Sequence, residues 1–307
     1  MKTKRHSLLT LLGALALATV QSYAAEPTQV LALWPGAAPG DKETLGPEQD
    51  QTKPSDGLVA GKQVIRLGNV SHPTISVYQP PSGKRNGAAV VVCPGGAYQI
   101  LALDLEGTEV CDWLNSEGIT AVLLKYRVPK RPGLEKHTAA LQDAQRALGL
   151  VRQHAKDWGI DPKKIGLLGF SAGGHLAALA SNQCEPRSYP AVDDADSISC
   201  RPDFTVLIYP AYLTVKEEGD RLAPEFHLTA DTPPTFIAMA EDDPVRVENA
   251  LFYAAALKKA KVPFELHIYP SGGHGYGLRP TKDLVTTWPK RAADWMRSRG
   301  LLGGNQL

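Results

Sequence analysis

The stretch "KIGLLGFSAGGHLAALAS", residues 164–181, joins a continuous apolar run to a serine among glycines and then to a run of small residues. This succession predicts a buried strand, a sharp turn and a helix. Ser171 lies at the turn, within "GFSAG" at 169–173, which matches the pattern G-x-S-x-G. Glycines on both sides would let the strand and the helix approach closely while the serine hydroxyl projects outward. We therefore expect Ser171 to act as a nucleophile.

Six other short apolar runs have the same character, at residues 74–80, 88–94, 120–126, 204–210, 235–241 and 264–270. Most are continuously apolar rather than alternating, as strands are when helices cover both faces of their sheet. Helical patterns lie between them, with apolar residues stepping by three and four positions from Leu141 to Trp158 and similar patterns at 247–257 and 288–299. The sequence predicts an α/β fold with a doubly wound, mostly parallel sheet, in which chemistry gathers beyond the carboxyl ends of the strands.

A serine hydroxyl needs a base to accept its proton, and two histidines are candidates. His267 lies inside the apolar run 264–270, which indicates a packed or sheet-face residue. His274 lies in "PSGGHGYGL", a loop just past that run, where neighbouring glycines would let the ring swing over the serine. We expect His274 to be the base.

The acid that orients this base is expected in "AMAEDDPVRV", residues 238–247, where an apolar run ends in two aspartates. Asp242 is nearer to the strand end, and Val245 follows it by three positions, which is the spacing of an aspartate and a valine in the serine-hydrolase pattern. Asp243 has no valine at that offset and would instead cap the next helix. The sequence favours Asp242 as the acid and leaves Asp243 as the alternative.

The anion that forms on attack needs backbone N–H donors that are already in place. The stretch "CPGGAY" supplies candidates, because Gly95 and Gly96 directly follow a predicted strand. The N–H of Ala172, the residue after the nucleophile, would complete this oxyanion hole. Tyr98 closes the same stretch and is expected to form a wall of the acyl pocket.

The beginning of the chain has the composition of an export signal, since basic residues precede an apolar run from Leu8 to Val20 and small residues follow it. We expect a signal peptide at 1–24, export to the periplasm or the medium, and one catalytic domain at 25–307. The apolar run is too short to span a membrane. Cleavage would remove three basic residues and lower the formal net charge from +1 to −2, which disfavours nucleic acid as a partner.

Four cysteines raise the question of a disulfide in an exported chain. Cys184 and Cys200 lie in one polar loop, and the sequence leaves open whether they are bridged or free. Cys93 and Cys111 lie in a predicted strand and a predicted helix, and we expect them to be free thiols.

Other polar features have structural interpretations as well as functional ones. The long loops 181–202 and 211–227 would either rim the cleft or be solvated connections. Asp143 and Arg146, three positions apart on the long predicted helix, are expected to form a structural ion pair. His175, one turn after the nucleophile, is expected to pack behind it.

From residue 33 to its end the chain resembles the α/β-hydrolase superfamily, in particular the small esterase and lipase-like branch that includes acetyl xylan esterases and some feruloyl esterases. The resemblance rests on "CPGGAY", "EGTEVCDWLNSEGITAVLLKYRVP", "GFSAGGHLA", "AEDDPV" and "GGHGYGL". It implies hydrolysis of short acyl esters, often acetyl groups on plant polysaccharides such as xylan, without metal or organic cofactor. The chain departs from the lipase pattern at Pro94, which replaces a histidine, and at Ala97, which replaces a third glycine.

Three other functions compete with an acetyl esterase. A feruloyl esterase would use the same residues on a bulkier acyl group. A serine peptidase of the prolyl-oligopeptidase kind would share the nucleophile and the "DD" motif, but such enzymes usually carry a propeller domain for which the predicted domain has no room. A non-enzymatic binding module with this fold would tend to have lost Ser171, His274 or the acid, and all three are present.

Overall fold

A computed structural model of the chain describes residues 26–41, 45–215 and 221–302. The signal peptide expected at 1–24 lies outside these ranges. None of the helices within them has the length and apolar character that a membrane crossing requires.

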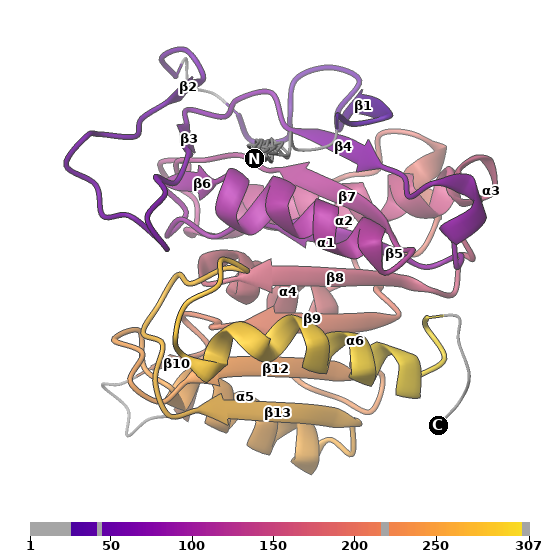
Figure 1. Cartoon of the computed structure of the whole chain (residues 1–307). Coiled ribbons are helices and arrows are strands. Elements are labelled where there is room, and N and C mark those ends of the chain that lie inside the picture. The colour runs from indigo at the N-terminus through magenta and orange to yellow at the C-terminus, as the bar shows by residue number, and fades with distance from the viewer. Residues whose placement is uncertain (1–25, 42–44, 216–220, 303–307) are drawn as a thin grey trace, which may run out of the picture.

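An eight-stranded sheet forms the centre of the molecule (Figure 1). In spatial order its strands are β1 (Gln29–Ala32), β4 (Thr74–Tyr78), β7 (Thr120–Lys125), β5 (Ala89–Cys93), β8 (Ile165–Phe170), β9 (Phe204–Ile208), β12 (Thr235–Ala240) and β13 (Phe264–Tyr269). The pairs β1–β4 and β4–β7 are antiparallel, and every later pair is parallel. This mostly parallel sheet confirms the predicted α/β fold.

The seven strands predicted from apolar runs are all present. The central strands β5, β8, β9 and β12 are buried along their whole length, which explains why their sequences are continuously apolar. The edge strand β1 is short and mostly exposed, so it carries no such run and was not predicted. Strand β13 lies at the other edge and is only partly buried.

Helices cover both faces of the sheet. In Figure 1 helices α1 (Glu109–Ser116) and α6 (Trp288–Ser298) lie in front, and α2 (Thr138–Gln153), α4 (Ala172–Asn182) and α5 (Glu248–Lys259) lie behind. The rings of Trp113 and Trp288 pack edge to face at 5.2 Å and join α1 to α6. The long helix predicted up to Trp158 is divided at His154 into α2 and the short α3 (Ala155–Trp158).

Two small sheets and several short turns supplement the main elements. A three-stranded antiparallel sheet joins β2 (Gln49–Asp50), β3 (Arg66–Gly68) and β6 (Ile100–Ala102), and a ribbon joins β10 (Thr214–Val215) to β11 (Arg221–Leu222). A π-helical turn at Asp104–Thr108 precedes α1, and 3-10 turns lie at Ser82–Lys84, Asp194–Ser197 and Leu284–Thr287. Strand β6 follows the loop that contains Gly95 and Gly96, so this sheet holds that loop from outside.

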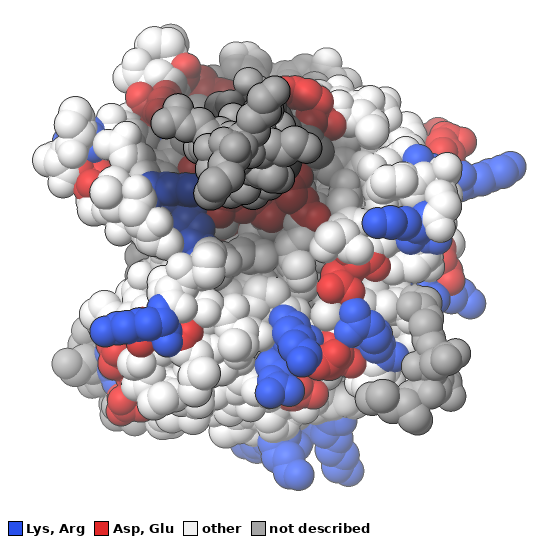
Figure 2. Space-filling view, in the orientation of Figure 1, with Lys and Arg blue, Asp and Glu red and all other residues white. Residues whose placement is uncertain are grey.

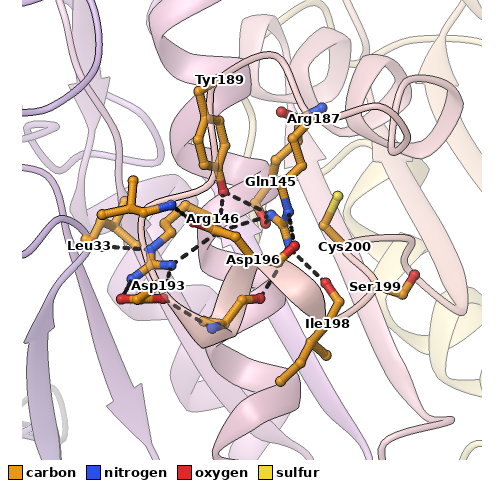
Figure 3. Close-up of polar contacts among 12 residues, drawn as sticks. Leu33, Gln145, Arg146, Arg187, Tyr189, Asp193, Asp196, Ile198, Ser199 and Cys200 are labelled. Carbon is orange, nitrogen blue, oxygen red and sulfur yellow. Dashed lines mark hydrogen bonds and ion pairs between the residues drawn. The ribbon is translucent and has the colours of Figure 1, made fainter.

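Arg146, on α2, is the centre of a polar network that ties the segment 183–203 to the helix (Figure 3). Its guanidinium donates to Asp193 at 2.6 and 2.5 Å, to the carbonyl of Leu33 at 2.9 Å, and lies 3.0 Å from Asp196. The side chains of Arg146 and Asp196 are almost fully buried, at 2% and 0% exposed. A buried charge of this kind needs such compensation, so the network fixes the segment in place.

The prediction of an ion pair between Asp143 and Arg146 is wrong. Asp143 accepts instead from the side chain of Arg127 at 3.0 Å and from the indole of Trp34 at 2.9 Å. Both Arg127 and Asp143 are completely buried. Asp143 and Arg146 therefore bind different segments of the chain.

Arg187 extends the network of Figure 3 to the end of the segment. It donates to the carbonyls of Gln145 and Ile198 at 2.8 and 2.6 Å. Close by, Cys200 donates its S–H to the carbonyl of Cys184 at 2.8 Å, and all four cysteines are free thiols.

The surface in Figure 2 carries acidic and basic side chains in mixed groups on the face shown. Among the ion pairs near the surface are those of Arg297 with Glu117 and with Asp294. No stripe of positive charge follows the face shown.

Candidate active site

Ser171 occupies the sharp turn between β8 and α4, with φ 51° and ψ −117°. This positive φ is unfavourable for a residue with a side chain, and the neighbouring close packing maintains it. A Cβ on Gly169 would lie 2.0 Å from the carbonyl oxygen of Gly173, and one on Gly173 would lie 2.1 Å from that of Cys93. Both glycines of G-x-S-x-G are therefore required by the contact of α4 with β8 and β5, and the turn presents Ser171 as predicted.

The imidazole of His274 lies against this serine. Its Nε2 is 2.8 Å from Ser171 Oγ, a distance at which the ring can accept the hydroxyl proton. His274 comes from the loop after β13, and the ring of Tyr209 packs edge to face against it at 5.0 Å. His267, the rejected candidate, lies on β13 and contacts Glu265 at 2.7 Å.

The acid beside this histidine is Asp243 and not the favoured Asp242. Asp243 places its two carboxylate oxygens 3.0 and 2.8 Å from His274 Nδ1, and its side chain is fully buried. Asp242 is exposed and accepts a hydrogen bond from the N–H of Gly273 at 2.8 Å. The turn after β12 explains the difference, because the N–H of Val245 donates to Asp243 Oδ1 at 2.7 Å and holds that side chain inward.

The loop after β5 offers a different set of donors from the one expected. The N–H of Gly95 donates to the carboxylate of Glu106 at 2.6 Å, so it is not available to an oxyanion. Within the described part of the chain, the N–H groups of Gly96 and Ala97 have no protein acceptor, and both residues line the cleft beside Ser171. Ala172 begins α4, where the N–H has no acceptor inside the helix. The donors that remain are Gly96, Ala97 and Ala172.

Glu106 is a residue of the site that the sequence did not reveal. It lies in the π-helical turn before α1, is 4% exposed, and accepts from Gly95 and from the hydroxyl of Tyr209 at 2.8 Å. Burial raises the pKa of this carboxyl. The N–H of Gly277 in turn donates to Tyr209 at 3.1 Å, so one buried carboxyl connects the Gly95 loop with the segment after His274. Its sequence "DLEG" resembles an ordinary helix start, which carries no signal of this role.

Tyr98 does not form a wall of the acyl pocket. It is 1% exposed, lies beneath the loop, and its hydroxyl contacts Nδ1 of His175 at 2.8 Å. His175 is completely buried and contacts Glu225 through Nε2 at 3.3 Å. The sequence therefore placed His175 correctly behind the nucleophile but did not anticipate its polar partners.

A cleft of about 540 Å³ lies over Ser171 and His274. It is lined by Val59, Val64, Arg66, Gly96, Ala97, Ile100, Ala102, Leu105, Glu106, Ala211, Tyr212, Val245 and Gly275 in addition to these two. The loop 211–227 supplies Ala211 and Tyr212, whereas the loop 181–202 supplies none of the lining residues and is the anchored segment of Figure 3. Most of the wall is apolar, and Arg66, paired with Asp56 at 3.0 Å, adds one cation.

The order of the sheet, the serine at the turn between β8 and α4, and the histidine after the last strand define an α/β-hydrolase with a site of the serine hydrolase type. The sequence matches the BD-FAE family over residues 75–198 and the prolyl oligopeptidase family over residues 138–299. Because the second match spans more than half of the chain, the chain belongs to the prolyl oligopeptidase family of α/β-hydrolases.

Individual relatives are named as ester hydrolases or xylan-degrading enzymes. An acetylxylan esterase of Xylanibacter ruminicola is 32% identical over 63% of this chain and 42% of its own length. Endo-1,4-beta-xylanase B of Butyrivibrio fibrisolvens is 31% identical over 61% of this chain and 32% of its own length. This chain thus spans less than half the length of these two curated relatives.

A solved structure agrees with this placement over a longer stretch. The acetyl ester-xyloside bifunctional hydrolase of Caldicellulosiruptor lactoaceticus is 35% identical and superposes with a TM-score of 0.71. The match covers 92% of this chain and all of that chain. The likeness therefore extends through the whole hydrolase fold rather than the nucleophile turn alone.

Proposed function

We propose that this protein is a serine carboxylesterase that hydrolyses short acyl esters, above all acetyl esters, on plant carbohydrate such as xylan or its oligosaccharides. The observation that carries the proposal is the chain of contacts from Asp243 through His274 to Ser171. The names of the relatives that act on xylan or on acetyl esters support the choice of substrate.

In the first half of the reaction, Ser171 Oγ attacks the ester carbonyl while its proton passes to His274 Nε2. The carbonyl oxygen becomes an oxyanion, which the N–H groups of Gly96, Ala97 and Ala172 stabilise. The bond to the alcohol then breaks, and the alcohol leaves with the proton that His274 carries. Asp243 holds the imidazole in the required tautomer and stabilises its transient positive charge.

In the second half, water attacks the acyl group now attached to Ser171. His274 accepts one proton of that water and then returns it to Ser171 Oγ as the acyl bond breaks. The products are the free acid and the restored serine.

The lining of the cleft favours a small acyl group. Its apolar side chains suit a short alkyl group, and Tyr212, 36% exposed, adds an aromatic side chain to the lining. We also propose that residues 1–24 direct the chain out of the cytoplasm. Outside the cytoplasm the protein would meet polymeric plant carbohydrate.

A prolyl peptidase is the second candidate, because the match to the prolyl oligopeptidase family favours it. Feruloyl ester hydrolysis is the third, because the BD-FAE match includes the nucleophile turn. All three reactions share the same acyl-enzyme chemistry. They differ in the acyl group and in the leaving group, so a panel of substrates separates them.

The experiment compares wild type with Ser171→Ala on 4-nitrophenyl acetate, acetylated xylo-oligosaccharides, a feruloylated oligosaccharide and a glycyl-prolyl anilide. We expect acetate esters to be the best substrates and the variant to lose at least ~10³-fold in kcat/KM. Equal rates for both proteins would overturn the esterase proposal. Preference for the anilide or the feruloyl ester would instead assign the second or the third function.

A further inference from the structure

Behind the nucleophile helix lies a cluster of three side chains that the proposed reaction does not use. His137 precedes α2, His175 lies in the first turns of α4, and Glu225 lies in the loop after β11. Each offers one nitrogen or oxygen atom, and these atoms lie within 4.8 Å of one another. The Nδ1 atom of His137 is buried without a hydrogen-bond partner among the described residues.

From this geometry we propose that His137, His175 and Glu225 bind one divalent transition-metal ion of the Zn²⁺ type. Two imidazoles and one carboxylate are a ligand set that Zn²⁺ accepts while keeping a fourth position open. Glu225 is 23% exposed, so an ion has a path from the solvent. The ion takes no part in ester hydrolysis, since the cluster lies behind Tyr98 rather than in the cleft.

The spacing of the ligands fits an ion better than it fits a strong hydrogen bond. His175 Nε2 and Glu225 Oε1 are 3.3 Å apart, which is long for a bond to a carboxylate. Two ligands at about 2.1 Å from a tetrahedral ion lie about 3.4 Å apart. The loosest separation in the cluster therefore has to shrink by at most about 1.4 Å.

Tyr98 gives the cluster a connection to the oxyanion loop. Without an ion, the Tyr98 hydroxyl donates to His175 Nδ1 and the N–H at Nε2 faces Glu225. An ion on Nε2 requires the other tautomer, in which the proton is on Nδ1 and is donated to the Tyr98 oxygen. Metal-bound histidines are commonly held in this way through their second nitrogen. Tyr98 directly follows Ala97, so the ion would reinforce the loop that supplies the oxyanion donors.

One charge opposes the ion, and it provides a directional test. Lys136 directly precedes His137 in the chain, and its ammonium lies 3.7 Å from the centre of the Tyr212 ring. Its positive charge acts on both histidines and on Glu225. Replacing it with a neutral side chain should strengthen metal binding, whereas a change to a ligand should weaken it.

The experiment uses the full chain without a polyhistidine tag, stripped with a chelator and titrated with Co²⁺ and Zn²⁺. We expect about one equivalent of Co²⁺ to give visible d–d absorption that Zn²⁺ abolishes, and Zn²⁺ to raise the melting temperature. His137→Gln and Glu225→Gln should each weaken binding by at least ~10-fold, and Lys136→Gln should strengthen it. Tyr98→Phe, which keeps all three ligands, should weaken binding by about 10-fold.

The control is His267→Gln, because His267 and Glu265 form a histidine–carboxylate pair on β13 at 2.7 Å outside this cluster. This variant should bind the metal as wild type does. Absence of stoichiometric binding by the wild type, or equal affinities of wild type, His137→Gln and Glu225→Gln, would overturn the proposal. These readouts do not depend on ester hydrolysis, so they stand apart from the test of the proposed function.

Discussion

Asp242 and Asp243 are neighbours in the chain, yet only one of them contacts the histidine. A single step along the backbone reverses the direction of the side chain at the end of β12, so Asp243 is buried against His274 and Asp242 faces the solvent. The number of positions between each aspartate and Val245 could not decide between them. The decisive contact is the hydrogen bond from the N–H of Val245 to Asp243, which exists only in the folded turn.

We expect Asp243→Asn to lower kcat on 4-nitrophenyl acetate by about 10³ to 10⁴-fold, because an amide favours the wrong tautomer of His274. Asp242→Asn keeps an oxygen for the N–H of Gly273 and should cost less than about 10-fold. Steady-state kinetics of both variants, with melting temperatures as a check of folding, decide the matter. A larger loss for Asp242→Asn would restore the choice favoured by the sequence.

At the scale of elements, the four strands buried along their whole length, β5, β8, β9 and β12, were all revealed by continuous apolar runs, as burial on both faces requires. Strands β2, β3 and β6 have two or three residues each and are fixed by pairing across the fold, which local sequence does not encode. The same limit applies to the oxyanion loop. The sequence revealed its glycines, but it did not reveal that the N–H of Gly95 donates a hydrogen bond to a carboxylate. That carboxylate belongs to Glu106, in the turn before α1.

Glu106 is a positioning residue, since it acts through the Gly95 loop. In Glu106→Ala the N–H of Gly95 and the hydroxyl of Tyr209 lose a buried partner, and the loop loses its fixed place. We expect kcat to fall by about 10 to 100-fold with a smaller change in KM, because oxyanion donors act mainly in the transition state. Glu106→Gln, which keeps an acceptor for Gly95, should recover most of this loss.

These kinetics are read together with the melting temperature of each variant. A fall in apparent kcat that matches the lost fraction of folded protein, with KM unchanged, would assign Glu106 a purely structural role. Equal kcat for wild type and Glu106→Ala would show that the loop holds its shape without the carboxyl.

At the scale of the whole molecule, the network around Arg146 joins three segments that are distant in the chain, at Leu33, α2 and Asp193. Hydrogen bonds from Arg146 lower the pKa of Asp193. A pKa lower in the folded than in the unfolded protein stabilises the fold above the unfolded value of 3.8, and this stabilisation is lost as pH falls through the folded value. The fold as a class was predictable from residue periodicity, but this network was not, because its members are brought together only by the sheet.

We therefore expect Asp193→Asn to lower the free energy of unfolding by about 1 kcal/mol at pH 6, a modest amount because the Asp193 side chain is 43% exposed. The difference from wild type should shrink as the pH falls below about 4. Urea unfolding at several pH values measures it, with the exposed neighbour Asp194→Asn as the control. A constant difference across this pH range would contradict the role of Asp193 ionisation.

Ser171 and His274 follow strands of the central sheet that differ in burial. Ser171 follows β8, a strand buried along its whole length, whereas His274 follows β13, the partly exposed edge strand. If β13 separates from the sheet on warming, the imidazole of His274 moves away while the hydroxyl of Ser171 keeps its position. The enzyme would then lose its activity reversibly at temperatures where the centre of the sheet is still folded.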